Sequence, residues 1–380
     1  MRIVHFADTH LGMTNFGSLD AATGLHDRVL DFLDAIDIIV TQVGRLKPDL
    51  IVFSGDGYRT RNPSQTLSVH YGKRIQAMAN VAPVVAVVGN HDRQKSGVEK
   101  KHAITAWSML QAKHPIYVLK DIAVVEFSHS YVVTLPWFYA SNPKPYIQQI
   151  LQAYDTIDDN LPIILVAHCD ADGAQYNEQK VVDIVDDQYV YPADLFTLFD
   201  YCALGHIHGQ QQVYPNTWYS GSVERVDWGE RKGDKGFLVI DLDNDGQLVN
   251  VQKVSTQPRP MKDIAVRYKH IQDLVDASVD DAVVRVTVDC DKLVSEAAVN
   301  KAVKRWLNGG YYYLDNVIVN VPRQGARVRD EWKEFAGTDQ TLLDELDTLE
   351  MYLIAQGVPD KRIDKLFTAA LKLKEKIGDG

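Results

Sequence analysis

Short runs of apolar residues alternate with stretches of helical periodicity through the first half of the chain. Four continuous apolar runs have the length of buried strands, and each leads into Gly, Asp, Asn or His: 3–7, 50–54, 84–88 and 163–167. Between the first two runs, residues 25–46 have helical spacing and stop before Pro48. Buried strands that lead repeatedly into polar loops predict α/β layers with a functional site along one edge of a sheet.

Further along, strands are expected to follow one another without helices between them. The segments 122–134 and 210–256 have this pattern, and the second includes apolar runs at 237–242 and 248–254. The later sheet should therefore be antiparallel or mixed. We expect an α/β fold in which a sandwich of two sheets is flanked by helices, over residues 1–256.

A linker bracketed by prolines, Gln257 to Pro260, separates this region from a new pattern. Strands are predicted at 264–268, 282–288 and 317–321, with helices at 271–277 and 294–307 between them. This succession predicts a second, small α+β domain over 261–325.

The last part of the chain carries two amphipathic helical stripes. Leu342, Leu346, Leu349 and Leu353 are spaced i, i+4, i+7 and i+11, and a second stripe follows Gly357 and Pro359. Two helices joined by a tight turn cannot bury such stripes alone. We therefore expect a helix pair at 338–378 that packs on the body of the protein or on a partner.

Composition narrows the class of protein. The 380 residues carry 40 Lys and Arg against 51 Asp and Glu, a formal net charge of −11, and 46% of them are hydrophobic. This is typical of a soluble globular chain and excludes disorder, collagen-like repeats and a disulfide scaffold. The three cysteines have no CxxC spacing, which favours reduced thiols and excludes a structural zinc finger. Because no leader pattern and no stretch of about 18 apolar residues occurs, we expect a cytoplasmic location without membrane association.

Polar elements stand at the ends of the apolar runs. They are Asp8-Thr9-His10, Gly55-Asp56, Gly89-Asn90-His91-Asp92, His168 and Gly205-His206-Ile207-His208. Because such strands end at one sheet edge, the fold would bring together Asp8, His10, Asp56, Asn90, His168, His206 and His208. Each element alone is most often a turn or a strand end, so only the complete set in this order predicts a site.

A pair of divalent metal ions would supply the counter-charge that clustered carboxylates and imidazoles need. Two ions a few ångströms apart share one carboxylate, and Asp56 is the natural bridge. The mixture of neutral imidazoles, carboxylates and an amide favours Mn, Fe or Zn over Mg or Ca. The pattern therefore predicts a dinuclear metal site.

His91 follows Asn90 directly, and neighbouring residues on a turn rarely bind the same metal. We expect His91 to be catalytic, either as general acid to the leaving alkoxide or as a cation that stabilises the transition state. Asp92 is expected to orient the ring of His91.

Together, the motifs DxH, GD, GNHD, H and GHxH resemble those of the calcineurin-like metallophosphoesterase superfamily, over residues 1–256. The superfamily's protein phosphatases follow the Gly-Asp with a nearby Asp-Arg-Gly, whereas Gly57-Tyr58-Arg59 follows here. The segments FADTHLG at 6–12 and YSGSVER at 219–225 are similar to the DNA double-strand-break repair nucleases of the SbcD and Meiotic-Recombination-Eleven type. The region after Pro260 resembles that family's capping domain and its docking site for an ATPase.

The resemblance implies a metal-dependent DNA exonuclease, endonuclease or both, acting at DNA ends in repair and recombination. One ion would be held by Asp8, His10, Asp56 and His208, and the other by Asp56, Asn90, His168 and His206, with Mn as the first choice. His91 would be the catalytic histidine. An SbcC-like ATPase of the SMC type would bind 338–378, and helices at 64–80 and 97–111 would form a homodimer. Arg59 stands where some members have a second histidine, which leaves the balance of exonuclease and endonuclease action open.

The charge along the chain is uneven. A net charge of −11 ordinarily disfavours a nucleic-acid partner, but residues 56–105 carry eight Lys and Arg against three Asp and Glu. DNA contacts are expected from Arg59, Arg61, Arg93 and Lys95, although a solvated helix face would have the same pattern. Two alternative functions stay open: a small-molecule phosphodiesterase or phosphatase on the same metal core, and a non-catalytic DNA-end scaffold for the ATPase.

Overall fold

A computed structural model describes most of the chain. The described residues are 1–94, 102–139, 142–157, 160–177, 180–181, 190–276, 279–290, 294–307 and 310–320, together with Leu353 and Lys365. The chain divides into two compact units, Met1–Met261 and Lys262–Gly380. The helix pair predicted at 338–378 lies outside the described residues, apart from those two single positions.

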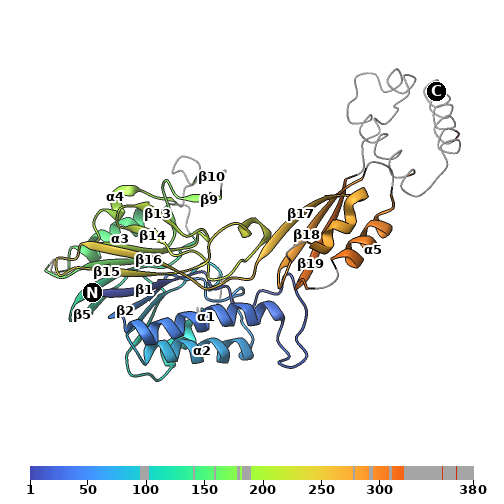
Figure 1. Ribbon diagram of the computed structural model, residues 1–380. Coiled ribbons are helices and arrows are strands. Elements are labelled where there is room, and N and C mark those ends of the chain that lie inside the picture. The colour runs from blue at the N-terminus through green and yellow to red at the C-terminus, as the bar shows by residue number, and fades with distance from the viewer. Residues whose placement is uncertain are drawn as a thin grey trace, which may run out of the picture. The chain divides into compact units, whose positions relative to one another are not determined.

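Two six-stranded sheets form the body of the first unit (Figure 1). The strands of the first sheet are β1 (Arg2–Phe6), β2 (Leu50–Phe53), β3 (Val84–Val87), β4 (Ile116–Leu119), β15 (Gly236–Leu242) and β16 (Leu248–Ser255). Their order is β16-β15-β1-β2-β3-β4. Strands β1 to β4 are parallel, whereas β15 and β16 are antiparallel to their neighbours.

The second sheet is also mixed. Its strands are β5 (Val124–Phe127), β6 (Ser130–Leu135), β7 (Ile163–His168), β12 (Tyr201–Gly205), β13 (Gln211–Tyr214) and β14 (Thr217–Tyr219). Their order is β13-β14-β12-β7-β6-β5, with parallel strands in the middle and an antiparallel strand at each edge. The expectation of a mixed later sheet is confirmed.

Helices and short ladders complete the first unit. The helices are α1 (Asp27–Leu46), α2 (Gln65–Ala79), α3 (Lys144–Tyr154) and α4 (Ala193–Phe196), with short 3-10 helices η1 (Thr105–Met109) and η2 (Trp228–Glu230). The ladders pair β8 (Asp170–Ala171) with β11 (Val190–Tyr191) and β9 (Gln175–Asn177) with β10 (Lys180–Val181). Within the described residues, no helix is long and apolar enough to cross a membrane.

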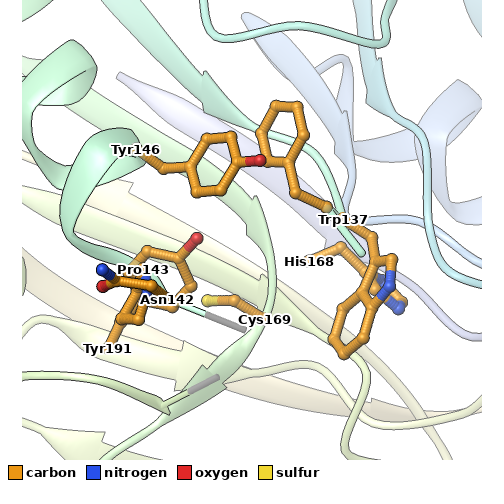
Figure 2. A pocket seen from close by; sticks show the side chains of 8 residues that line it. Trp137, Asn142, Pro143, Tyr146, His168, Cys169 and Tyr191 are labelled. Atoms are coloured by element: carbon orange, nitrogen blue, oxygen red, sulfur yellow. The ribbon is translucent and has the colours of Figure 1, made fainter. Parts of the chain in front are cut away.

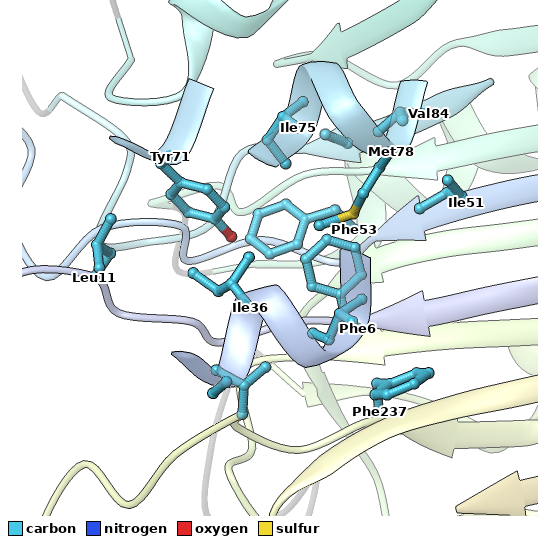
Figure 3. Close-up of a cluster of buried hydrophobic side chains, with 14 of the residues drawn as sticks. Phe6, Leu11, Ile36, Ile51, Phe53, Tyr71, Ile75, Met78, Val84 and Phe237 are labelled. Atoms are coloured by element: carbon cyan, nitrogen blue, oxygen red, sulfur yellow. The ribbon is translucent and has the colours of Figure 1, made fainter. Parts of the chain in front are cut away.

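Apolar side chains fill three layers of the first unit. One lies between the first sheet and α1 and α2, where Phe6 and Phe53 meet Ile36, Ile75 and Met78 (Figure 3). A second joins the facing sides of the two sheets, and a third lies under α3 and α4. The predicted α/β sandwich of two sheets flanked by helices is therefore confirmed.

The helix predicted at 97–111 is wrong for the part that is described. Residues 102–111 contain only the 3-10 turn η1. The hydroxyl of Thr105 accepts a hydrogen bond from the His102 amide, and the hydroxyl of Ser108 donates to the Thr105 carbonyl. Such local side-chain bonds compete with the α-helical pattern.

The second unit has its own core. Its elements are β17 (Met261–Arg267), η3 (Tyr268–Asp276), β18 (Val283–Asp289), α5 (Glu296–Trp306) and β19 (Tyr313–Asn320). The strands form a sheet in the order β17-β18-β19, and Val286 and Val288 of the sheet pack with Val299 and Val303 of α5. This is the predicted order of elements, although the first helix is a 3-10 helix. The role of this unit as a capping domain stays a prediction.

Candidate metal centre

The predicted polar elements all stand at the carboxyl ends of parallel strands. Asp8 and His10 follow β1, Asp56 follows β2, and Asn90 follows β3 of the first sheet. In the second sheet, His168 ends β7, and His206 and His208 follow β12. Because β7 and β12 are parallel neighbours, as are β1, β2 and β3, the two sheets bring these residues to one place.

The backbone at these strand ends is held in an uncommon conformation. Asp8, His10, Asp56 and His206 have φ angles of 49°, 38°, 60° and 103°. Non-glycine residues adopt positive φ rarely, and such strain concentrates at functional sites. The Asp8 amide donates to the Gly55 carbonyl at 2.9 Å and the His10 amide to the Asp56 carbonyl at 3.1 Å, which ties the two loops together.

Two glycines of the motifs are required by close approach. A Cβ atom on Gly89 would lie 2.2 Å from Asp56 Oδ1, and one on Gly205 would lie 2.1 Å from the Ser54 carbonyl oxygen. Real Cβ atoms do not come this close to another atom, so a larger residue would push the strand ends apart.

The first set of side chains, called here the Asp8 group, consists of Asp8, His10 and His208. Their ligand atoms all lie within 4.8 Å of one another. His10 Nε2 and His208 Nε2 are 2.9 Å apart. The carboxylate of Asp8 is buried and accepts the His206 amide at 3.1 Å on each oxygen.

A charged network fixes the ring of His208. Its Nδ1 lies 2.6 Å from Glu230 Oε1, so this nitrogen donates and Nε2 faces the site. Lys235 Nζ lies 2.6 Å from the other Glu230 oxygen and donates to the His208 carbonyl at 2.9 Å. Glu230 Oε2 also accepts the Val226 amide. Burial acts to raise the pKa of Glu230, but the His208 bond and the Lys235 charge lower it from its ordinary 4.5 to about 2.

The second set, called here the His168 group, consists of Asp56, Asn90, His168 and His206. His168 Nε2 lies 2.8 Å from Asn90 Oδ1, and His206 Nδ1 lies 3.1 Å from the same oxygen. Asp56 Oδ2 lies 3.5 Å from His168 Nε2 and 3.7 Å from His10 Nε2. Asp56 therefore lies between His168 and His10 of the Asp8 group, where a bridging carboxylate would lie.

The rings of the His168 group are held differently. His168 Nδ1 lies 2.6 Å from the backbone carbonyl oxygen of Ser54 and donates to it. His206 Nε2 lies 3.5 Å from Asp170 Oδ2. The Ser54 carbonyl thus orients the imidazole of His168, and the Asp170 carboxylate lies beside Nε2 of His206.

Burial and mutual charge shift the pKa values of this centre. Burial acts to raise the pKa of Asp56, but His168 and His10 lower it well below its ordinary value. Burial acts to lower the pKa of His168, but Asp56 raises it to about 9. The pKa of His10 is lowered by burial and by His208. The site therefore favours positive charge close to Asp56 and disfavours a proton on His10.

The donor set fits divalent metal ions. The Nδ1 atoms of His168 and His208 donate outward, so their Nε2 atoms face Asn90 Oδ1 and His10 Nε2. Lone pairs that face one another at these distances repel unless a proton or a cation lies among them. Imidazole nitrogens and carboxylate oxygens that converge in this way, with the rings of His168 and His208 held by outward hydrogen bonds, are typical of transition-metal sites.

Residues 1–210 match the family model described as calcineurin-like phosphoesterase. The chain belongs to this family. It is also similar to a Staphylococcus epidermidis protein named as the SbcD component of the nuclease SbcCD, with 27% identity over 300 residues, which cover 72% of this chain and 74% of that one.

Two solved structures have weaker likeness. A phosphopantetheinyl hydrolase from Mycobacterium tuberculosis has a TM-score of 0.37 at 10% identity, over 65% of this chain and 95% of that one. A glutamine-dependent NAD+ synthetase from Acinetobacter baumannii has a TM-score of 0.32 at 12% identity, over 95% of this chain and 72% of that one. These scores are too low to inform the fold or the function of this phosphoesterase.

His91 lies at the edge of the centre, but Asp92 does not orient it. The His91 amide donates to Asp56 Oδ1 at 2.8 Å, and His91 Nδ1 lies 3.1 Å from the Arg59 carbonyl oxygen and 3.2 Å from Arg59 Nη1. The Asp92 carboxylate instead accepts the backbone amides of Gly57, Tyr58 and Gly89. The predicted role of Asp92 as the partner of His91 is therefore wrong, because the turn directs the two side chains to different neighbours.

The four basic residues predicted to contact DNA differ in their surroundings. Arg59 is exposed beside His91, whereas Arg61 donates to the Arg93 carbonyl and to the Tyr139 hydroxyl. Arg93 donates to the Lys120 carbonyl and covers the ring of Phe138. Lys95 lies outside the described residues. Of the described three, Arg59 is the one next to the centre of the phosphoesterase.

The sequence reasoning missed the supporting roles of Glu230, Lys235 and Asp170. Glu230 is 22 residues from His208 along the chain, so only the folded loop reveals the pair. Asp170 had a usable signal. It stands two residues after His168, which ends β7, so it is close to the centre along the chain.

Proposed function

We propose that this phosphoesterase is a metal-dependent DNA nuclease that hydrolyses phosphodiester bonds at DNA ends in double-strand-break repair. It would be the nuclease component of an SbcC–SbcD type complex. The observation that carries the proposal is the position of Asp56 between His10 of the Asp8 group and His168, with the His91 amide bonded to it. The family and the similarity to the SbcD component of a nuclease SbcCD support it further.

The two groups would hold one ion each. Asp8, His10, Asp56 and His208 would bind the first, and Asp56, Asn90, His168 and His206 the second, as a pair of Mn ions. When bound, the ions would supply positive charge against the phosphate oxygens and promote deprotonation of water. Glu230 and the Ser54 carbonyl keep two of the rings in the tautomer that binds metal through Nε2.

His91 would hold the proton that passes to the leaving oxygen. Burial lowers the pKa of His91, while the negative charge of Asp56 raises it. A phosphodiester anion against the ring adds negative charge and favours its protonated form. Arg59, whose Nη1 lies 3.2 Å from the ring, would clamp a non-bridging phosphate oxygen and orient the substrate toward His91.

The direct test is cleavage of an end-labelled DNA duplex in the presence of Mn²⁺. We expect cleavage by the wild type and a loss of roughly 10²- to 10⁴-fold in His91→Ala, with Mn binding retained, because general acid catalysis contributes about this factor. His114→Ala is the matched control, since His114 is exposed and far along the chain from the site. Rapid hydrolysis of cyclic nucleotides or phosphomonoesters without any DNA cleavage would instead support the small-molecule alternative.

The partners are part of the same proposal. We infer that an SbcC-like ATPase binds the segment 338–378, that the chain forms a homodimer, and that it acts in the cytoplasm. Deleting residues 338–380 should abolish association with the ATPase but leave Mn-dependent cleavage intact. If the truncated chain still binds the ATPase, the docking segment lies elsewhere.

A further inference from the structure

A buried histidine outside the metal centre lies between the two sheets. His5 of β1 is fully buried, and so are Ser54 and Tyr201 beside it. Because alternate strand residues share a face, His5 lies on the same side of β1 as Ile3, which is part of the apolar layer between the sheets. A polar ring in such a layer is costly unless its nitrogens are hydrogen-bonded, so its partners have to lie within the layer.

Hydrogen bonds join His5 to both sheets. Its Nδ1 lies 2.8 Å from the hydroxyl of Tyr201 in β12, and its Nε2 lies 3.1 Å from the hydroxyl of Ser54, which follows β2. The Ser54 hydroxyl in turn donates to the carbonyl of Ala203 in β12 at 2.9 Å. The bonds to Tyr201 and to Ala203 therefore cross from the first sheet to the second. We call His5, Ser54 and Tyr201 the His5 bridge.

The donors of the His5 bridge have one consistent arrangement. The single hydroxyl proton of Ser54 goes to the Ala203 carbonyl, so Ser54 has to accept a hydrogen bond from His5 Nε2. His5 Nδ1 then carries no proton and accepts from the Tyr201 hydroxyl. Burial lowers the pKa of His5 from its ordinary 6.5 to about 3, which agrees with a neutral ring. His5 is therefore a neutral connector with a fixed tautomer.

The His5 bridge is connected to a residue of the metal centre. The backbone carbonyl of Ser54 accepts His168 Nδ1 at 2.6 Å. A Cβ atom on Gly205 would lie 2.1 Å from the same carbonyl oxygen, so the two sheets approach each other closely at Ser54. The ring of Trp137 meets His168 edge-on, with centroids 6.1 Å apart and 78° between the planes (Figure 2). This aromatic contact limits where the ring lies, and the bond to Ser54 determines which nitrogen faces the site.

We propose that Ser54 is a positioning residue of the metal centre, held in place by His5 and Tyr201. The Ser54 hydroxyl, held between His5 and the Ala203 carbonyl, fixes the position of the Ser54 carbonyl, and that carbonyl directs His168 Nε2 into the site. The inference rests on the proposed function, because it requires His168 to bind a metal ion. A bridge that only stabilised the packing of the sheets would leave metal affinity unchanged, and this difference can be measured.

Ser54→Ala in the full-length protein tests the proposal. Isothermal titration should show an affinity for Mn²⁺ that is lowered by roughly tenfold, the low end of what the outer partner of a ligating histidine contributes, because the carbonyl itself remains. Thr134→Val is the matched control, since Thr134 is a buried residue of β6 whose hydroxyl donates to the carbonyls of Asp121 and Ala123. The control should lose stability against denaturant but keep its affinity for Mn²⁺.

Two further measurements do not depend on the folding of Ser54→Ala. Tyr201→Phe keeps the aromatic ring and removes only the hydroxyl that donates to His5, so it should lower the affinity for Mn²⁺ by a smaller factor than Ser54→Ala. The nitrogen chemical shifts of His5 in the wild type, measured by NMR near neutral pH, should show a neutral ring with its proton on Nε2.

The outcomes separate this inference from the proposed function. Unchanged affinity for Mn²⁺ in Ser54→Ala and Tyr201→Phe, with stability lowered as in Thr134→Val, would overturn the positioning role and leave the proposed nuclease intact. A proton on His5 Nδ1 would overturn the positioning role as well. Weaker Mn²⁺ binding by Ser54→Ala, with no DNA cleavage by the wild type, would support the positioning role and overturn the nuclease. A wild type that binds no Mn²⁺ would overturn both.

Discussion

The two halves of the metal centre are oriented by different means. In the His168 group, the ring of His168 is fixed by a backbone carbonyl at the end of β2. In the Asp8 group, the ring of His208 depends on Glu230, which is held in turn by Lys235 and by the Val226 amide. The first arrangement follows as soon as the two sheets pack. The orientation of His208 also requires the loop between β14 and β15 to fold correctly, so it is more sensitive to single substitutions.

Asp56→Asn should have the largest effect, since it damages both halves together. Removing the shared negative charge is expected to lower phosphodiester hydrolysis by about 10³-fold or more and to reduce the amount of Mn bound per chain. The rate and the metal content by elemental analysis give the two measurements. Asp245→Asn, in the exposed turn between β15 and β16, is the control. Full Mn content in Asp56→Asn would show that the two halves do not share this carboxylate.

Glu230→Gln should damage the Asp8 group alone. Metal affinity is expected to fall by roughly 10- to 100-fold, since the outer partner of a ligating histidine contributes about this much. Lys235 would become a buried cation without its carboxylate, which should cost about 3 kcal/mol of unfolding free energy. Metal titration and denaturant unfolding measure the two effects. Unchanged metal affinity would mean that the ring of His208 needs no partner.

The pH dependence of stability should distinguish the halves in the metal-free protein. Glu230 has a folded pKa of about 2 against an ordinary 4.5, so its contribution is present above pH 4.5 and is lost as the pH falls toward 2. His168 has a folded pKa of about 9, so its contribution is present below pH 6.5 and is lost as the pH rises through 9.

Denaturant unfolding of the wild type and Glu230→Gln across this pH range checks the comparison. The difference between them should shrink from roughly 3 kcal/mol at pH 7 to near zero at pH 2, because one pKa unit corresponds to about 1.4 kcal/mol. A difference that stays constant through the acid range would contradict the assigned role of Glu230.

Asp170→Asn should have the smallest effect. Its Oδ2 lies 3.5 Å from His206 Nε2, at the long end of hydrogen bonding, so the loss in metal affinity should be about tenfold or less. Isothermal titration with Mn²⁺ measures it against Glu230→Gln. A loss as large as that of Glu230→Gln would remove the contrast between the halves.

Much of the site could be predicted because its residues follow strands that are themselves easy to predict. Continuous apolar runs indicate β1, β2, β3 and β7, and in parallel sheets the residues after such runs meet at one edge. That argument identifies the residues that converge. It does not give side-chain direction within a turn. The predicted pairing of Asp92 with the adjacent His91 is therefore wrong, and Asp92 accepts amides from Gly57 and Gly89 instead.

Contacts between residues that are distant in the sequence could not be predicted, for a different reason. Glu230 belongs to a loop without periodicity, and its approach to His208 depends on Lys235 and Ser222 nearby. The η1 turn could not be predicted in place of an α-helix, because apolar spacing does not reveal the hydrogen bonds that Thr105 and Ser108 form with the local backbone. Periodicity describes which side of an element is buried, and it is silent about polar contacts in loops.

The seven convergent residues come from both sheets, three strands of one and two of the other. Metal ions bound by all seven residues would cross-link the two sheets of the sandwich. Because unfolding would release the ions, the unfolding free energy would rise with the concentration of free metal. In a cell short of the metal, this protein would lose not only its chemistry but also part of what keeps its two sheets together.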